Sequence, residues 1–333
     1  MKVGILGTRH VHADGLAACV ERAHGTIVGA TERDATAAAA WTRSELLDRD
    51  ALIARSDAII VAGTNRERVD DVIAATRAGK PVLSEKPVAA DGDELARLIA
   101  AADPSLVMVA LPVRFGASLQ RARAAIEAGA IGTPLAARGT NHGQFPGGWF
   151  GQRADAGGGA LQDHVVHLSD ALCWLLGDRI TRAYARAAHV LRPDNDVEDC
   201  GVVTLDFESG FFASIDSSWS RPESFPTWGD VWLELVGTAG RIRIDPMATH
   251  LDLYSDTAGK LQHVGYSDDD MTLEMVRAFL DFARLRTGAA DAGASGVDFG
   301  SPVSFDEGVH ASDVVLAAYA SVESGRPEPV ASR

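Results

Sequence analysis

The stretch that decides the fold is AIIVAGTNRERVDDVIAATRAGKPVLSEKP, residues 58–87. It begins with an apolar run, continues with apolar residues at helical spacing over residues 67–78, and returns to an apolar run at residues 81–83. Short apolar runs separated by a helix of about ten residues are typical of βαβ units, in which the two strands are parallel. The stretch therefore predicts part of a parallel sheet with a crossover helix.

The same alternation continues on both sides of this stretch. It predicts further strands at residues 2–6, 26–30 and 106–110, and further helices at residues 11–23, 35–48 and 94–102. Because βαβ crossovers are right-handed, such helices wind onto both faces of the sheet. We therefore predict an α/β domain over residues 1–115, built as a Rossmann-type doubly wound parallel sheet.

The pattern changes after residue 115. Strand-like segments follow one another without helices between them at residues 181–189, 201–207, 211–219, 232–236, 241–244 and 251–254. Helices are expected at residues 272–286 and 305–324, and the small residues at 288–300 predict a surface loop. Residues 116–333 are therefore predicted to form an α+β domain with a large, mostly antiparallel open sheet.

Composition restricts the classes of partner. The 333 residues carry a formal net charge of −15, which argues against nucleic acid and anionic membranes as partners. Cys19, Cys173 and Cys200 are too far apart for a CxxC pair, so a reducing cytoplasm is expected. No apolar run approaches the length of a membrane span, and the first residues do not resemble a signal peptide.

The turn after the first strand, GTRHVH at residues 7–12, lies where the dinucleotide fingerprint G-x-G-x-x-G would be. Only Gly7 of the three glycines is present, with Arg9 and His12 in the second and third positions, so an ordinary βα turn remains an alternative. Glu32 follows the second strand, where a carboxylate would bind the ribose 2′-hydroxyl of NAD. The neighbouring Arg33 would suit a 2′-phosphate, which leaves NADP possible.

Several motifs resemble one family. Ser84-Glu85-Lys86-Pro87 after the fourth strand, Arg114-Phe115, the AGAIG turn at residues 128–132 and GGGALQDHVVHLSD at residues 157–170 resemble, in order, motifs of the Gfo/Idh/MocA oxidoreductases. This resemblance covers essentially the whole chain. It implies a nicotinamide-dependent dehydrogenase acting on a sugar, an inositol or a related polyol, with NAD as the cofactor and a homodimeric or homotetrameric assembly.

The chain departs from the family pattern at three places. Arg9 replaces the second glycine of the first turn, Thr64-Asn65 stands where Pro-Asn is common, and Pro112-Val113 replaces an Asn-Tyr-like pair. The departures at Arg9 and His12 keep open a ligand-binding or regulatory relative without redox turnover. A third alternative retains NAD and uses transient oxidation for elimination or deglycosylation.

Three residues are predicted to be catalytic. Lys86 lies between an apolar strand and a proline, where its ammonium group would stabilise charge on the substrate oxygen. Asp163 and His167 are four residues apart, so a helix places them on one face as a carboxylate and a proton acceptor. The structural alternatives are a surface lysine, an aspartate at a helix start and a buried histidine.

The glycine triplet at residues 157–159 is expected to let the chain turn into this helix. Asp163, His164 and His167 also offer metal-ligand atoms. Because neighbouring residues on a helix point about 100° apart, Asp163 and His164 are not expected to share an ion, and no metal site is predicted.

The remaining site residues are predicted by their positions in these motifs. Candidate cofactor-binding residues are Gly7, Thr8, Arg9, His10, Glu32, Arg33, Thr64, Asn65, Glu85 and Lys86. Candidate substrate-binding residues are Arg114, Asn141, His142, Trp149 and His164. The expected partners are a small sugar or polyol and further copies of this chain.

Overall fold

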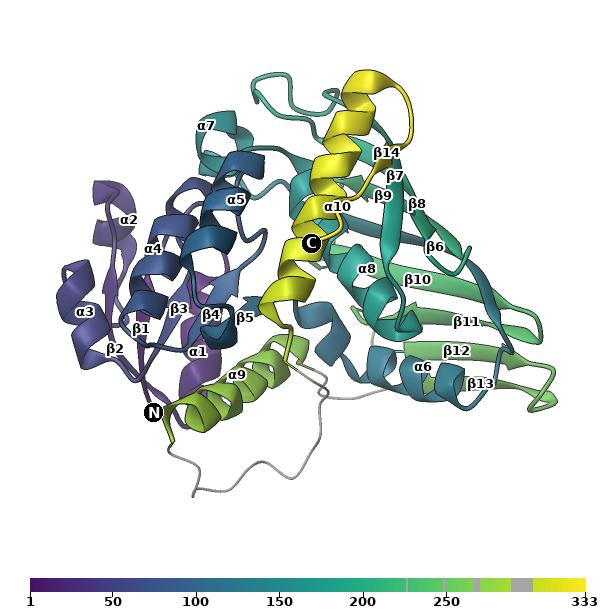
Figure 1. The fold of residues 1–333 in the computed structure, drawn as a ribbon, viewed down its shortest axis with the longest axis horizontal. Helices are drawn as coiled ribbons and strands as arrows, with labels where there is room; N and C mark the ends of the chain where they lie inside the picture. Colours follow the sequence, from purple (N-terminus) through teal and green to yellow (C-terminus); the bar gives the residue numbers. More distant parts are fainter. Residues whose placement is uncertain (226, 248–249, 266–269, 289–301) are drawn as a thin grey trace. The chain divides into compact units, whose positions relative to one another are not determined.

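The structure is a computed structural model that describes all residues except 226, 248–249, 266–269 and 289–301, and the predicted loop at 288–300 lies almost entirely outside the described residues. The chain divides into two compact units. The first comprises Met1–Pro112, Ala154–Gly157 and Thr272–Val309, and the second comprises Val113–Arg153, Gly158–Met271 and His310–Arg333. Each unit is built around its own sheet (Figure 1).

The first unit contains a five-stranded, fully parallel sheet. Its strand order is β2 (Thr26–Thr31), β1 (Lys2–Leu6), β3 (Ala58–Val61), β4 (Val82–Glu85) and β5 (Val107–Ala110). The predicted α/β fold is confirmed. The direction in which successive strands are added reverses between β1 and β3, and ligands of such sheets bind beyond the carboxyl ends of the strands at this point.

The helices of the first unit follow from right-handed crossovers. The first crossover carries α1 (Ala13–Arg22) on one face, and the later crossovers carry α3 (Arg49–Arg55), α4 (Asn65–Arg77) and α5 (Gly92–Ala101) on the other. A short turn, η1 (Pro104–Leu106), precedes β5. The unit also includes α9 (Met271–Thr287) from residue 272 onward and most of α7 (Arg153–Ala156).

One predicted helix is much shorter than expected. The helix expected over residues 35–48 ends at Ala40, as α2 (Ala35–Ala40). Tertiary pairing explains the difference, because Ala30 at the end of β2 donates its N–H to the Glu45 carbonyl and accepts the Leu47 N–H. Residues 45–47 therefore pair with β2 instead of continuing the helix, and this pairing outweighs the helix propensity of the segment.

The second unit contains a nine-stranded sheet. Its order is β13 (Lys260–Gly265), β12 (His250–Ser255), β11 (Gly240–Asp245), β10 (Gly229–Gly237), β6 (Pro134–Gly143), β9 (Phe212–Ser218), β8 (Cys200–Phe207), β7 (Ile180–Ala188) and β14 (Glu328–Pro329). All pairs are antiparallel except β6 with β9, so the predicted α+β unit with a mostly antiparallel sheet is confirmed.

The strand β6, which lies between β10 and β9, was not predicted from the sequence. Its sequence PLAARGTNHG lacks the alternation of apolar and polar residues that marks an isolated strand. It is held by long registers on both sides, from Pro134 to Gly143 with β10 and from Ala136 to His142 with β9.

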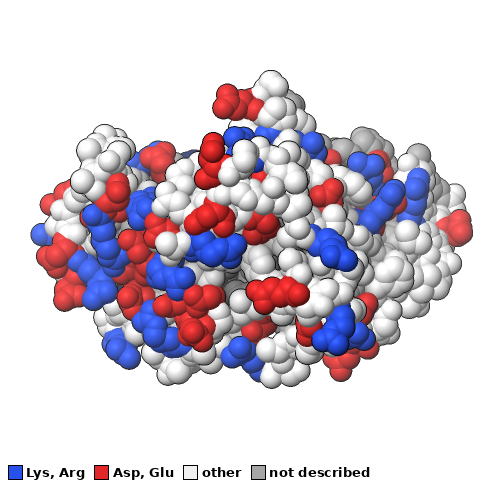
Figure 2. Space-filling view, turned by 90° about the horizontal axis from the view of Figure 1, so that it is seen from above, with Lys and Arg blue, Asp and Glu red and all other residues white. Residues whose placement is uncertain are grey.

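Helices cover one face of this sheet. The helix α8 (Ala160–Leu176) packs on β6, β8 and β9, and α6 (Ala117–Glu127) packs on α8 and β11. The helix α10 comprises Phe305–Ser324. Two short turns precede helices in the sequence: η2 (Pro112–Phe115) precedes α6, and η3 (Gly148–Gly151) precedes α7. Among the described residues, no helix is long and apolar enough to span a bilayer. On the face drawn in Figure 2, basic and acidic side chains are interspersed.

Candidate functional site

The turn after β1 is pressed against the turn after β3. Gly7 has φ +78°, and a methyl group there would overlap the backbone of Gly63. Only glycine meets both conditions, the left-handed φ and the close backbone approach. The His10 N–H donates to the Ala62 carbonyl at 3.1 Å and joins the same two turns again. The predicted residues Gly7 and His10 therefore lie at the reversal point of the strand order.

Glu32 accepts four hydrogen bonds at the end of β2. Thr8 donates its N–H and its hydroxyl to Oε2, both at 2.7 Å, and the backbone N–H groups of Arg33 and Asp34 donate to Oε1, both at 2.8 Å. A carboxylate has about four acceptor sites, so this network fixes the orientation of Glu32 closely. The predicted residues Thr8 and Glu32 are brought together.

The basic side chains around this turn are paired with carboxylates. Arg33 forms a two-pronged ion pair with Asp71, at 2.8 and 3.2 Å, and hydrogen bonding to this carboxylate raises the pKa of Arg33. Arg9 lies 3.1 Å from Asp155 and 3.9 Å from Glu67. The structure thus directs Arg33 to Asp71 in α4, and Arg9 to two acidic side chains of the same unit.

Thr64 and Asn65 begin α4. Thr64 caps the helix, since its hydroxyl accepts the Glu67 N–H and the Glu67 carboxylate accepts the Thr64 N–H. The Asn65 amide donates to the Ala156 carbonyl at 2.8 Å and accepts from Arg68 at 2.8 Å. Both predicted cofactor residues therefore also organise the start of this helix.

Glu85 and Lys86 lie at the carboxyl end of β4 and are both buried. Burial alone would raise the pKa of Glu85, but the charges of His10 and His12, a hydrogen bond with His12 and the charge of Lys86 lower it far below its usual range. Burial lowers the pKa of His10. At neutral pH the Glu85 carboxylate is therefore ionised and the His10 ring is neutral. Lys86 is 3% exposed and is not the surface lysine of the structural alternative.

In the second unit, Gly158 and Gly159 of the glycine triplet pack against Tyr319 and Glu198. Gly157 has φ +82°, while methyl groups at Gly158 and Gly159 would overlap the Tyr319 hydroxyl and the Glu198 carbonyl oxygen. The Glu198 carboxylate accepts the N–H groups of Gly159 and Leu161 at 3.0 Å and the Tyr319 hydroxyl at 2.8 Å. An acidic group here satisfies the first N–H groups of α8 and interacts favourably with the helix dipole.

Asp163 makes contacts on the first turn of α8. Its Oδ2 accepts the indole N–H of Trp219 at 3.0 Å and lies 3.2 Å from Nε2 of His164. The expectation that the side chains of Asp163 and His164 diverge is therefore wrong, because side-chain torsions bring adjacent residues together despite their angular separation. His167 is buried on the same helix.

The predicted substrate residues lie at separate places in the second unit. Asn141 in β6 donates to the His164 carbonyl at 3.1 Å, which brings it to α8. His142 lies on the opposite face of the pleat, with Asp216 at 3.1 Å and Asp230 at 3.3 Å. Arg114 forms a buried two-pronged ion pair with Asp170. Trp149 in η3 stacks on Phe150.

Three residues around α8 were missed, namely Asp170, Glu198 and Trp219. Their partners lie 56, 37 and 56 residues away in sequence. Asp170 lies inside the glycine and histidine motif of residues 157–170. Its signal was its position seven residues after Asp163, which places both acidic residues on one face of a helix. Glu198 carried no local signal, because its role depends on the approach of the loop before β8 to the glycine triplet.

Comparisons with known proteins agree with this geometry. Residues 1–114 match the model described as "Oxidoreductase family, NAD-binding Rossmann fold", and residues 119–243 match the GFO/IDH/MocA C-terminal domain. The chain is 27% identical over 251 residues to 1,5-anhydro-D-fructose reductase of Ensifer adhaerens, covering 72% of this chain and 74% of the relative. It is 28% identical over 268 residues to inositol 2-dehydrogenase 3 of Saccharopolyspora erythraea, covering 75% of each.

Solved structures show the same fold at lower sequence identity. Levoglucosan dehydrogenase in complex with NADH and levoglucosan has a TM-score of 0.84, with 20% identity and complete coverage of both chains. An oxidoreductase from Agrobacterium radiobacter in complex with NAD+, L-tartaric acid and magnesium has a TM-score of 0.78, with 19% identity and 98% coverage of both chains.

Proposed function

Because the chain belongs to the Gfo/Idh/MocA family of NAD-binding oxidoreductases, we propose that it transfers a hydride between nicotinamide and a secondary alcohol or ketone of a sugar, inositol or related polyol. The observation that carries this proposal is the buried Lys86 at the carboxyl end of β4 in an NAD-binding Rossmann unit. Relatives named for anhydrofructose, inositol and levoglucosan support the substrate class.

The residues of the first unit fit NAD. The compact Gly7–Gly63 contact and the strand reversal support this proposal, because a dinucleotide would bind at such a reversal point. The Glu32 carboxylate suits a ribose hydroxyl donor, with Thr8 giving up part of its interaction. Arg33 is engaged by Asp71 rather than directed to a 2′-phosphate, which favours NAD over NADP. When bound, NAD supplies the hydride acceptor or donor.

Lys86 stabilises the substrate oxygen in this proposal. A buried ammonium group is poorly screened by water, so its attraction for negative charge developing on that oxygen is strong. Glu85 precedes Lys86, and its carboxylate accepts the backbone N–H of Lys86 at 3.1 Å.

In the second unit, His167 is proposed to accept the hydroxyl proton and Asp163 to orient the substrate hydroxyl. Trp219 holds Oδ2 of Asp163, which keeps the carboxylate directed. His164 is proposed as a substrate residue. Its buried Nδ1 has no hydrogen-bond partner among the described groups, and a substrate hydroxyl would satisfy it.

The assembly is proposed to be a homodimer or homotetramer through the sheet face that α6 and α8 leave uncovered. Phe212 and Val236 flank Ala136 on this face and are 53% and 43% exposed. Val202 and Tyr254 lie exposed on the same face. Exposed apolar patches of this kind mark interaction surfaces. Light scattering that gave a monomer at micromolar concentration would contradict it.

The cofactor and substrate roles are assigned to residues 1–115 and 116–333, respectively. A cytoplasmic location is proposed from the cysteines, since Cys19, Cys173 and Cys200 are all described and none forms a disulfide.

The proposal is tested with a panel of polyols, sugars and sugar acids, followed by NADH absorbance in the presence of NAD. On a substrate found in this way, Lys86→Met and His167→Gln should each lower kcat by about 100-fold or more. Lys2→Met and His189→Gln, at exposed positions, are the matched controls. Unchanged turnover in Lys86→Met and His167→Gln would contradict the assigned roles.

A further inference from the structure

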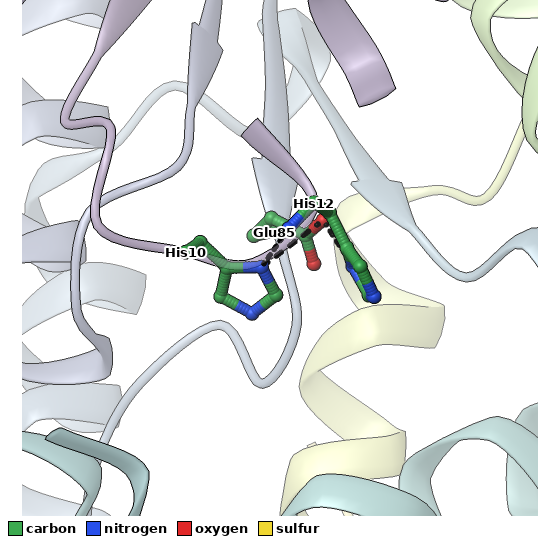
Figure 3. A group of neighbouring side chains, drawn as sticks. All are labelled: His10, His12 and Glu85. Carbon is green, nitrogen blue, oxygen red and sulfur yellow. Dashed lines mark hydrogen bonds and ion pairs between the residues drawn. The ribbon is translucent and has the colours of Figure 1, made fainter. Parts of the chain in front are cut away.

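The first unit contains a cluster of two histidines and one glutamate to which no catalytic role is assigned above. His10, His12 and Glu85 each offer one donor atom, and these atoms all lie within 4.8 Å of one another. His10 and His12 come from the turn after β1, while Glu85 ends β4, two strands away in the sheet. Figure 3 shows both imidazole rings beside the Glu85 carboxylate.

The distances converge on a single oxygen. Oε1 of Glu85 lies 2.9 Å from Nδ1 of His12 and 3.8 Å from Nδ1 of His10. The other oxygen, Oε2, accepts the backbone N–H of Lys86 at 3.1 Å. The carboxylate is therefore oriented by its own backbone, with one oxygen left toward the two rings. Outer hydrogen bonds of this kind orient the ligands of metal sites.

The two histidines are also held in place. His10 is 3% exposed and is fixed through its N–H to the Ala62 carbonyl. His12 is the N-cap residue of α1 but its side chain makes no cap hydrogen bond, and this side chain is 43% exposed. The ring centroids of the two histidines are 4.6 Å apart. One edge of the cluster is thus buried and the other is open to solvent.

We propose that His10, His12 and Glu85 form a binding site for a divalent transition-metal ion of the Zn²⁺ type. Two imidazoles and one carboxylate are a ligand set of three-ligand zinc sites, which keep a further position for water or another oxygen donor. The site accounts for His12 standing where a dinucleotide fingerprint has glycine. It does not depend on the proposed substrate or on the proposed catalytic residues.

The chain also contains the groups that oppose an ion here. Lys86 and Arg68 carry positive charge near His10. Glu85 offsets one of these charges. A direct measurement of metal binding distinguishes the cluster with a bound ion from the cluster without one, and this measurement does not depend on catalysis.

The test is calorimetric titration of the chelator-treated full chain with Zn²⁺, together with the visible absorption of Co²⁺ bound in its place. We expect one ion per chain and a Co²⁺ spectrum of low coordination number. His12→Gln should weaken Zn²⁺ binding by about 100-fold or more, and Glu85→Gln should do the same. His12→Gln is the more decisive variant, because it replaces a partly exposed side chain that caps no helix.

The matched control is His189→Gln, which removes an exposed histidine of the second unit and should leave the Zn²⁺ stoichiometry and affinity unchanged. Absence of Zn²⁺ binding in the wild-type chain would overturn the site. Equal affinity in the wild type and in a folded His12→Gln variant would also overturn it. Since no substrate or NAD is present, failure here is distinguishable from failure of the proposed dehydrogenase activity.

Discussion

Thr8 binds one oxygen of Glu32 twice, through its backbone N–H and through its hydroxyl, each at 2.7 Å. The turn after β1 and the end of β2 are thereby fixed to each other. The carboxylate is already oriented at the position that would meet the ribose 2′-hydroxyl, and Arg33 next to it is held by Asp71. A 2′-phosphate at this position would face the negative charge of Glu32, while the neighbouring Arg33 already pairs with Asp71.

We therefore predict a preference for NAD over NADP that depends on Glu32. Charges a few ångströms apart near a protein surface interact by up to about 4 kcal/mol, so even partial relief of the repulsion is measurable. Glu32→Gln should lower the ratio of kcat/KM for NAD to that for NADP by about 10-fold or more. Asp34→Asn is the matched control, because it removes the same charge two residues away and keeps a side chain that can cap α2. An equal ratio in the wild type and Glu32→Gln would contradict the prediction.

The buried ion pair between Arg114 and Asp170 gives a second prediction, for stability. Arg114→Met removes the two-pronged partner of a buried carboxylate, so it should lower the free energy of unfolding by about 3–5 kcal/mol. The double variant Arg114→Met with Asp170→Leu should recover about 2 kcal/mol or more of this loss. Urea denaturation of the wild type, both single variants and the double variant completes the cycle. A double variant as unstable as the sum of the single variants would show that the two residues are not coupled.

The parts of the fold that could be predicted are those with local signals. The runs ending at Leu6 and Val61 are buried strands bounded by a glycine or a turn, and their pattern does not depend on distant residues. Tertiary pairing decided the segments that were predicted wrongly. Residues 45–47 pair with β2 instead of continuing α2, and β6 is a strand because β10 and β9 hold it on both sides.

The same division applies to the candidate site. Glu32 and Lys86 follow strands, and the carboxyl ends of parallel strands meet at one edge of the sheet, so their position could be predicted. Glu198 and Trp219 reach α8 from the loop before β8 and from the residue after β9. Such contacts depend on the strand register, which the sequence of either segment alone does not contain.

A third prediction concerns the hydrogen bond from Trp219 to Asp163. Trp219→Phe keeps an aromatic ring in a buried position but removes the N–H that holds Oδ2 at 3.0 Å. We expect kcat to fall by about 10-fold with a smaller change in KM, because the Asp163 carboxylate loses its orientation while the pocket keeps its shape. Trp174→Phe, a change of another buried tryptophan, is the matched control. If kcat is unchanged while KM rises, the tryptophan shapes the pocket and does not orient Asp163.

A fourth prediction compares two glycines. Gly159→Ala places a methyl group on the Glu198 carbonyl oxygen, so it should displace the start of α8 and lower stability by about 2 kcal/mol or more. Gly15→Ala is the matched change in α1, where a methyl group meets no atom within 4 Å, and it should raise stability by about 0.5–1 kcal/mol. Thermal unfolding of both variants is the measurement. Similar shifts in the two would mean that the Gly159 backbone moves away from Glu198 at little cost.

The last prediction concerns pH and rests on His310 in α10. Burial, with a further contribution from the charge of Arg179, lowers the pKa of His310 to about 4. The same histidine in the unfolded chain has a pKa of about 6.5. Between these two values the unfolded chain binds a proton that the folded chain does not, so the free energy of unfolding decreases as the pH falls. The contribution is fully present above the unfolded pKa and is lost by about pH 4.

His310→Asn tests this directly. Asparagine does not titrate, and its side-chain oxygen can accept the hydrogen bond that Arg179 makes to Nδ1 of His310 at 3.1 Å. From about pH 7.5 to about pH 5, urea unfolding should show the wild type losing about 1–2 kcal/mol relative to the variant, where the lower value allows for solvent screening. His189→Asn, at an exposed position, measures the effect of removing a surface histidine. A stability difference between wild type and His310→Asn that stays constant over this range would mean that His310 is protonated alike in the folded and unfolded chains.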